Sequence, residues 1–170
     1  MQGLAGRLAL GQFRVRESLR KYNKHPGTTV LTTPASSAPL SLEIAAKTDP
    51  GVLRSLNEDS IATVNDLGLL VLSDGMGGYQ SGDVASNLTT QVIVEGLTRE
   101  LQGKPARGDG VAGVVENVVK RANRAIYQEG QQRAQRILNT QDQTMGSTLA
   151  LLLFRDNRVT LAHVGDSRIY

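Results

Sequence analysis

The segment at residues 71–86 carries the clearest chemical signal in the chain. It reads V-L-S-D-G-M-G-G-Y-Q-S-G-D-V-A-S, so an apolar run leads into one carboxylate, Asp74, and then into a turn rich in glycine. Glycine lets backbone carbonyl oxygens approach a ligand where a Cβ atom would block them, and hard cations prefer carboxylate and carbonyl oxygens. The pattern therefore favours a cation site, with one oxygen from Asp74 and another from the Gly75 carbonyl.

The alternative interpretation of this segment is a simple turn, because Asp caps backbone amides and Gly adopts positive φ angles. Other polar segments favour a site. Residues 54–60 read R-S-L-N-E-D-S, residues 146–148 read G-S-T and residues 165–168 read G-D-S-R, and each segment adjoins an apolar, strand-like run. Acidic residues at three strand ends predict one shared site.

In this order, the segments resemble the metal-dependent protein serine/threonine phosphatases, also called protein phosphatase type 2C, in their bacterial form. The matching pieces are R-S-L-N-E-D-S, D-G-M-G-G-Y-Q-S-G-D-V-A-S, G-S-T-L-A and V-G-D-S-R-I-Y, and the resemblance extends from about Leu42 to Tyr170. Each piece alone is a weak signal, but the ordered set is strong. The resemblance implies hydrolysis of phosphoserine and phosphothreonine in proteins by a metal-activated water, with two Mn²⁺ or Mg²⁺ ions and a weaker third ion.

The resemblance also implies roles for individual residues. Asp74 would bridge the two metal ions, and the Gly75 carbonyl would bind one of them. Asp59 would act in the outer part of the metal site, and Glu58 beside it would hold a water molecule there. Arg54 matches the arginine that clamps the phosphate in bidentate fashion, and its alternative role is that of a solvated turn residue.

The resemblance also bears on the G-D-S-R segment and on Met76. Asp166 matches the acidic residue of the family's G-D-S-R segment, which is associated with the weaker third metal; a structural role at a turn is equally open. Ser167 and Arg168 are expected to hold that turn. Some family members carry histidine where Met76 stands, and methionine cannot donate a proton, so a water of the metal site would have to protonate the leaving group.

Other chemistries find little support in the sequence. The chain has no cysteine, which excludes disulfides, thiolate zinc sites and cysteine nucleophiles. The two histidines, His25 and His163, belong to no Ser/His/Asp pattern. His163 alternates with Leu161 in a strand-like run, which is typical of a packed core histidine. The glycine spacing at residues 75–82 fits neither a dinucleotide-binding nor a Walker fingerprint.

Composition divides the chain into three parts. Residues 1–24 form a basic arm, for which a solvated or partner-binding role is favoured over an organelle transit peptide. Residues 25–41 carry three prolines among Thr, Ser and Ala and are predicted to be a linker. The resemblance implies that residues 42–170 are the N-terminal portion of a type 2C phosphatase domain. Residues 1–40 carry six basic residues and one acidic residue, so the overall net charge of +3 does not argue for nucleic acid binding by the domain.

Hydrophobic patterns predict two hairpins. Runs at residues 61–64 and 68–73 are joined by a short loop that ends in Gly68, and runs at 148–154 and 159–164 form the second pair. The uniformly apolar stretch inside the first hairpin suits a strand covered on both faces. An alternating segment from Leu42 gives way to a turn at residues 49–51.

Two helices are predicted between the hairpins, one after residues 81–82 and running to about residue 101, and one from about residue 110 to 129 or beyond. The expected inner face of the first is Ala85, Leu88, Val92 and Gly96. The stripe of the second is Val111, Val115, Val118, Ala122 and Ile126, with core packing favoured over a partner groove. Periodicity alone indicates a mixed α and antiparallel β domain. The resemblance implies an α+β fold, a four-layer α-β-β-α sandwich of two antiparallel sheets flanked by helices and incomplete at the C-terminus.

The family pattern continues after the G-D-S-R segment with two more aspartate motifs that complete the metal site. Because the chain ends at Tyr170, we expect a fragment or a natural truncation, with low activity on its own. The alternative function is a non-catalytic module that binds phosphoproteins or a signalling partner. The expected partners are phosphorylated proteins and a cognate Ser/Thr kinase system, without nucleic acid or a membrane span. A monomer in the cytoplasm is expected.

Overall fold

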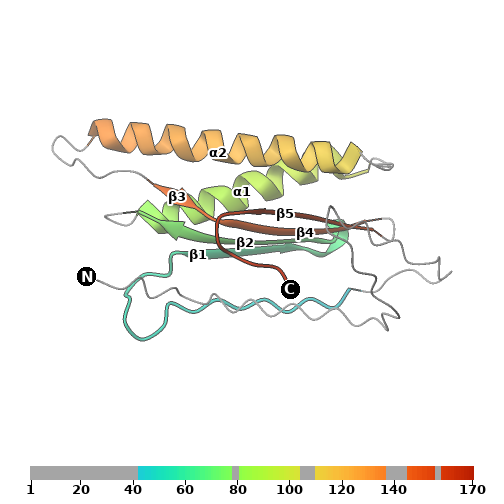
Figure 1. Cartoon of the computed structure of the whole chain (residues 1–170), viewed down its shortest axis with the longest axis horizontal. Coiled ribbons are helices and arrows are strands. Elements are labelled where there is room, and N and C mark those ends of the chain that lie inside the picture. The colour runs from blue at the N-terminus through green and yellow to red at the C-terminus, as the bar shows by residue number, and fades with distance from the viewer. Residues whose placement is uncertain (1–41, 78–80, 104–109, 137–144, 156–157) are drawn as a thin grey trace.

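The structure, a computed structural model, describes residues 42–77, 81–103, 110–136, 145–155 and 158–170. The predicted basic arm at residues 1–24 and the linker at residues 25–41 lie outside the described residues. The α+β class is confirmed, because an antiparallel sheet packs against two helices (Figure 1).

The described elements follow one another as hairpin, helix pair and hairpin. In chain order they are β1 (Asp59–Val64), the 3₁₀ turn η1 (Asn65–Leu67), β2 (Leu69–Met76), α1 (Ser81–Leu101), α2 (Gly110–Arg136), β3 (Gly146–Ser147), β4 (Leu149–Arg155) and β5 (Arg158–Val164). The predicted hairpins and helices are confirmed, and the two-residue strand β3 is an addition that the sequence patterns did not predict. Neither α1 nor α2, the described helices, is long and apolar enough to cross a membrane.

Both hairpins belong to the same sheet. Its order is β1-β2-β4-β5, with antiparallel pairing throughout, and β3 pairs with the end of β2. Leu69 of β2 lies opposite Leu153 of β4, so two segments more than 80 residues apart are joined at the centre of the sheet. The described residues therefore contain one sheet and the helix layer on one of its faces, which is half of the predicted four-layer arrangement.

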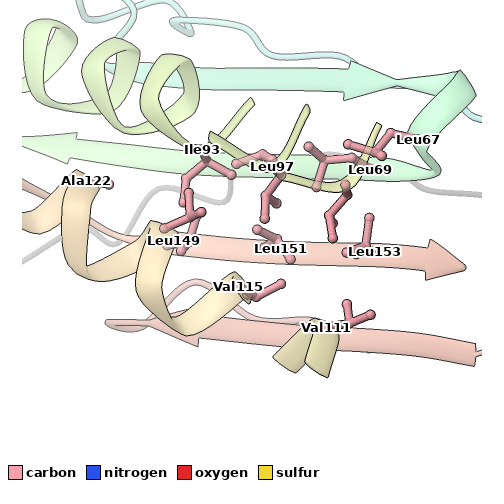
Figure 2. Close-up of a cluster of buried hydrophobic side chains, with 13 residues drawn as sticks. Leu67, Leu69, Ile93, Leu97, Val111, Val115, Ala122, Leu149, Leu151 and Leu153 are labelled. Atoms are coloured by element: carbon pink, nitrogen blue, oxygen red, sulfur yellow. The ribbon is translucent and has the colours of Figure 1, made fainter. Parts of the chain in front are cut away.

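A purely aliphatic core fills the space between the sheet and the helices (Figure 2). Its members come from η1, β2, β4 and both helices, and the strand members are alternate residues, which point to the same face. Those on β4 are Leu149, Leu151 and Leu153. Leu70 and Leu72 of β2 point to the opposite face and are also buried, which confirms the prediction of a strand covered on both faces.

The two helices differ in how well their inner faces were predicted. All five residues of the predicted α2 stripe are buried. On α1, Ala85 and Gly96 are buried as predicted, but Leu88 and Val92 are only partly buried. The buried face instead includes Thr89 and Thr90, because their hydroxyls bond to Ser147 and Ser60 of the sheet. The buried residues of α1 are Ser81, Gly82, Ala85, Ser86, Thr89, Thr90, Ile93, Gly96, Leu97 and Leu101.

The ends of the first hairpin agree with the predicted turns. Gly68 adopts a φ of 67° and its N–H donates to the Asn65 carbonyl at 3.0 Å, which closes the β1–β2 connection. At the predicted turn before β1, the Gly51 N–H donates to Asp49 Oδ1 at 2.8 Å. The alternating segment from Leu42 forms no strand.

His163 is not a core residue. It shares a face of β5 with Leu161 as predicted, but both side chains are exposed. The helix core contacts the opposite face of β5, through Ala162. The prediction of a packed histidine was wrong because alternation identifies which residues share a face, whereas the elements packed on the strand decide which face is buried.

Candidate metal centre

Two aspartates lie opposite each other at the open end of the β1–β2 hairpin. The register pairs Asp59 of β1 with Asp74 of β2. Opposed residues of an antiparallel pair have Cβ atoms about 4.5–5.5 Å apart, and like charges in this position are destabilising. A cation bound between the two carboxylates would remove that repulsion.

The environment of Asp74 opposes its ionisation. Burial, the charge of Asp59, a side-chain hydrogen bond with Asp59 and the charge of Asp166 raise the pKa of Asp74 from 3.8 to about 6, against a smaller lowering by Arg54. Each carboxylate contributes because it lies close enough to repel the negative form of Asp74. The structure thus brings together Asp59, Asp74 and Asp166, which come from three strand ends.

Asp166 reaches this place by the turn that follows β5. Gly165 adopts a φ of +87°, a left-handed conformation that side-chain-bearing residues rarely take. Ser167 bonds to Thr148, so this turn is attached to the residue between β3 and β4 that also bonds to the backbone of Asp74. The prediction that Ser167 holds the turn agrees with this contact.

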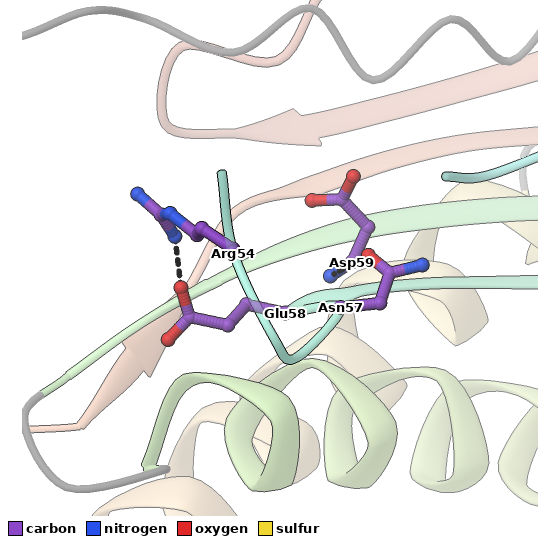
Figure 3. A network of polar contacts seen from close by, with 4 residues as sticks. All are labelled: Arg54, Asn57, Glu58 and Asp59. Atoms are coloured by element: carbon purple, nitrogen blue, oxygen red, sulfur yellow. Dashed lines mark hydrogen bonds and ion pairs between the residues drawn. The ribbon is translucent and has the colours of Figure 1, made fainter. Parts of the chain in front are cut away.

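Arg54 and Glu58 form an ion pair, which Figure 3 draws together with Asp59. The Arg54 side chain is 50% exposed and the Glu58 side chain is 19% exposed. Figure 3 also shows that Glu58 and Asp59 project in different directions, as successive residues of an extended chain do. The side chain of Glu58 therefore lies near the first turn of α1, whereas Asp59 faces Asp74.

Two glycines make the approach of β2 to α1 possible. The Gly75 N–H donates to the Glu58 carbonyl at 2.9 Å. A Cβ at Gly75 would collide with the Gly82 carbonyl oxygen, and a Cβ at Gly82 would lie 2.5 Å from Glu58 Oε1 and 3.0 Å from the Gly75 carbonyl oxygen. Glycine at position 82 thus keeps a Cβ away from the Gly75 carbonyl oxygen, which the sequence predicted to bind a cation.

Two residues that were given no role in the sequence analysis support Asp59. Asn57 accepts the Asp59 N–H at 3.1 Å through Oδ1 and donates from Nδ2 to Thr48 Oγ1 at 3.0 Å. Thr48 Oγ1 in turn lies 3.4 Å from Asp59 Oδ2. Asn57 stands in the N-E-D motif and could have been found from it, but Thr48 lies outside every motif.

These residues fit one side of a divalent metal site. The donors are carboxylate oxygens and one backbone carbonyl, which suit Mn²⁺ or Mg²⁺ and would not suit a soft metal. Within the described ranges, no three acidic or histidine side chains form a closed ligand group. Asp74, Gly75 and Asp59 would therefore hold a metal ion only with further oxygen ligands, such as water.

Residues 54–170 match the family model described as protein phosphatase 2C. This chain belongs to that family. The match begins at Arg54 and includes all the predicted site residues, so the sequence resemblance is confirmed.

Curated relatives of this protein phosphatase 2C domain come from bacteria. The chain is 37% identical over 131 residues to the serine/threonine protein phosphatase PstP of Mycobacterium tuberculosis, covering 77% of this chain and 23% of the relative. It is 35% identical over 132 residues to the protein phosphatase PhpP of Streptococcus pneumoniae, covering 75% and 49%. The chain thus spans about half or less of the length of these relatives.

Solved structures share the fold of this phosphatase 2C domain. The catalytic domain of PstP in complex with two manganese ions superposes with a TM-score of 0.60 at 34% identity, covering 73% of this chain and 48% of that one. The serine/threonine phosphatase of S. agalactiae gives a TM-score of 0.56 at 29% identity, covering 71% and 47%. The manganese in the PstP complex is consistent with the donor set described above.

The raised pKa of Asp74 predicts that Mn²⁺ binding to this phosphatase 2C site strengthens with pH. Protons and a metal ion held by Asp74 would compete for the same carboxylate, and a group with a pKa of about 6 is mostly protonated at pH 5 and mostly ionised at pH 7. Mn²⁺ affinity, measured from the electron paramagnetic resonance of the free ion, should therefore rise about tenfold between these pH values.

In the metal-free protein the same group contributes stability below about pH 4, and this contribution is lost as pH rises through about 6.

A histidine variant provides the control for this pH dependence. Imidazole groups in general change charge in the same range, so His163→Asn should retain the tenfold rise if Asp74 causes it. Equal Mn²⁺ affinity at pH 5 and pH 7 would contradict the raised pKa of Asp74.

Proposed function

We propose that this domain hydrolyses phosphoserine and phosphothreonine in proteins with the help of Mn²⁺ or Mg²⁺. The observation that carries the proposal is the convergence of Asp59, Asp74 and Asp166 at one end of the sheet, with Arg54 close enough to lower the pKa of Asp74. Three carboxylates gathered at one place favour a cation that would offset their mutual repulsion, and the nearby arginine suits an anionic substrate. The serine/threonine phosphatase names of the bacterial relatives support the same reaction class.

The acidic residues of this chain would place the hydrolytic water and hold its cation. In the reaction, a water oxygen bonds to phosphorus, the bond from phosphorus to the serine or threonine oxygen breaks, and that oxygen takes up a proton. When bound, the metal ions supply acidification of water and neutralise charge on the phosphoryl oxygens. Asp74 and the Gly75 carbonyl would hold two such ions, Asp59 and Glu58 would act in the outer part of the site, and Asp166 would hold a weaker third ion.

Met76 cannot supply the proton that the leaving serine or threonine oxygen takes up. Met76 ends β2 two residues after Asp74 and is 68% exposed, and its Cε lies 2.9 Å from the position that a Cβ on Gly146 would occupy. A thioether has no proton to donate. Protonation of the serine or threonine oxygen is therefore assigned to water.

Arg54 is proposed to bind the phosphate of the substrate. Its ion pair with Glu58 uses Nη1, and a guanidinium has five N–H donors, so donors remain for a phosphate. The two residues are four positions apart in the segment that precedes β1, and their ion pair holds the Arg54 side chain next to Glu58. This pairing would orient Arg54 before substrate binds.

Replacing Arg54 is expected to weaken substrate binding more than the chemical step. Hydrogen bonds to charged groups contribute about 1.5–3 kcal/mol, so Arg54→Ala in the full-length protein should raise KM for a phosphothreonine peptide about tenfold to 100-fold. Arg54→Lys should recover only part of this, because lysine cannot bind a phosphate in bidentate fashion. Steady-state phosphate release with Mn²⁺ measures the effect. Arg99→Ala, which removes an exposed charge near the far end of α1, serves as the control.

The same experiment separates the enzyme from a non-catalytic binding module. Metal-dependent phosphate release by the full-length protein supports hydrolysis. Phosphopeptide binding that requires Arg54 but occurs without any phosphate release would instead support the module.

The proposed partners are phosphorylated proteins and the Ser/Thr kinase that produces them. The proposed location is the cytoplasm, because the absence of cysteine in the chain fits a reducing environment.

A further inference from the structure

Thr148 is bonded to the backbone of Asp74 in both directions. The Thr148 N–H donates to the Asp74 carbonyl at 2.8 Å, and the Asp74 N–H donates to Thr148 Oγ1 at 3.0 Å. The neighbouring Ser73, which is fully buried, donates from its hydroxyl to the Thr148 carbonyl at 2.8 Å. One residue between β3 and β4 therefore satisfies both backbone groups of Asp74.

Thr148 also contacts the turn that carries Asp166. Its Oγ1 lies 2.6 Å from Ser167 Oγ. Its methyl group packs on Gly165, where an added Cβ would lie 3.0 Å from Thr148 Cγ2. Asp166 is thus held between two residues that both rest on the Thr148 side chain.

The hydroxyl of Thr148 is required for both connections. A hydroxyl has two acceptor lone pairs and one proton, so Oγ1 can accept the Asp74 N–H and still bond to Ser167 as donor or as acceptor. Valine has the same shape without this capacity, and it would leave the Asp74 N–H without its acceptor. Serine keeps the hydroxyl and loses only the methyl contact with Gly165.

We propose that Thr148 is a positioning residue that fixes Asp74 and Asp166 relative to each other. Its backbone and hydroxyl hold the strand end that carries Asp74, while its hydroxyl and methyl hold the turn that carries Asp166. The link couples the two sides of the acidic site through a single side chain. The consequence for metal binding rests on the proposed function, whereas the coupling between the two segments does not.

The adjacent residue provides a matched control. The Ser147 hydroxyl bonds to Thr89 Oγ1 on α1 at 2.5 Å, away from the acidic turn. Ser147→Ala therefore removes a hydroxyl at the next position, from a hydrogen bond of similar length, without touching the link between Asp74 and Asp166. It reports the cost of losing any hydroxyl at this end of the sheet.

The first measurement is amide hydrogen exchange in the metal-free full-length protein, resolved by nuclear magnetic resonance. In Thr148→Val, the amides of Asp74 and of residues 166 and 167 should all exchange about tenfold faster. Ser167→Ala should speed exchange only in the turn, and Ser147→Ala should leave all three amides unchanged. Thr148→Ser should stay close to the wild type at Asp74.

The second measurement is Mn²⁺ affinity by electron paramagnetic resonance. Removal of groups that orient metal ligands typically weakens metal binding about 10- to 100-fold, and Thr148→Val should fall in this range. Thr148→Ser should recover most of the Mn²⁺ affinity, because serine keeps the hydroxyl. If lost packing of the methyl group caused the effect, serine would not recover the affinity. The effects of Thr148→Val and Ser167→Ala should not add in the double variant, because both remove the same link.

The outcomes distinguish this inference from the proposed function. If wild-type protein binds no Mn²⁺, the proposed function fails, and the exchange pattern still decides the coupling. If Thr148→Val leaves exchange at Asp74 and in the turn unchanged, the coupling is overturned. If Thr148→Val does not fold, Ser167→Ala decides: unchanged exchange in the turn would overturn the link.

Discussion

Asp74→Asn is expected to abolish Mn²⁺-dependent hydrolysis of p-nitrophenyl phosphate by the full-length protein. Loss of a single electrostatic stabilising group in an active site commonly lowers kcat by about 10²–10³-fold, and Asp74 is proposed to hold both metal ions, so the loss should be at least about 1,000-fold. Asparagine retains the shape and the backbone hydrogen bonds to Thr148, so the change removes little besides the charge. The assay is the initial rate at saturating Mn²⁺.

Stability provides an internal check on Asp74→Asn. Asp74 lies opposite Asp59 in the register, so neutralising it should stabilise the metal-free protein at pH 7, where the wild-type repulsion is largest. A variant that is inactive and melts at a higher temperature than wild type would show that activity is lost at the site and not by unfolding. Asp66→Asn, at an exposed position in η1, is the control for charge removal. Full activity of Asp74→Asn would show that the proposed site is wrong.

Gly75→Ala is expected to produce the largest loss of stability among single substitutions near the site. The added Cβ would meet the Gly82 carbonyl oxygen and lie 2.8 Å from the Glu58 carbonyl oxygen, and both atoms belong to backbone that cannot rotate away. Separating β2 from the start of α1 should lower the free energy of unfolding by about 3 kcal/mol or more. Urea denaturation monitored by circular dichroism measures the change.

Gly113→Ala is the matched control for Gly75→Ala. Gly113 lies in α2 with nothing within 4 Å of its added Cβ, so the same chemical change meets open space. Alanine is favoured over glycine in a helix by about 1 kcal/mol, so this variant should be more stable than wild type. Equal effects of the two substitutions would show that the contact between β2 and α1 is not tight.

The acidic site was largely predictable because its signals are local. Asp59 precedes the run at residues 61–64, whereas Asp74 and Asp166 follow apolar runs and adjoin glycines, so these strand ends can be recognised locally. The α2 stripe was predictable for the same reason, since residues such as Val115 and Val118 recur at helical spacing on an otherwise polar helix. Local patterns of this kind depend on the geometry of one element at a time.

The tertiary structure decided everything that depends on which elements meet. Pairing of β2 with β4 joins the two hairpins in one sheet, and it brings Thr148 to the backbone of Asp74 from a position 74 residues away. On α1, Thr89 is buried in place of Leu88 because its hydroxyl bonds to Ser147 of the sheet. Hydrophobicity cannot predict the burial of a polar side chain that gains a hydrogen-bond partner in the fold. Strand order, register and hydrogen bonds between distant segments follow from the packing of the whole domain, because each strand alone can present either face to the core.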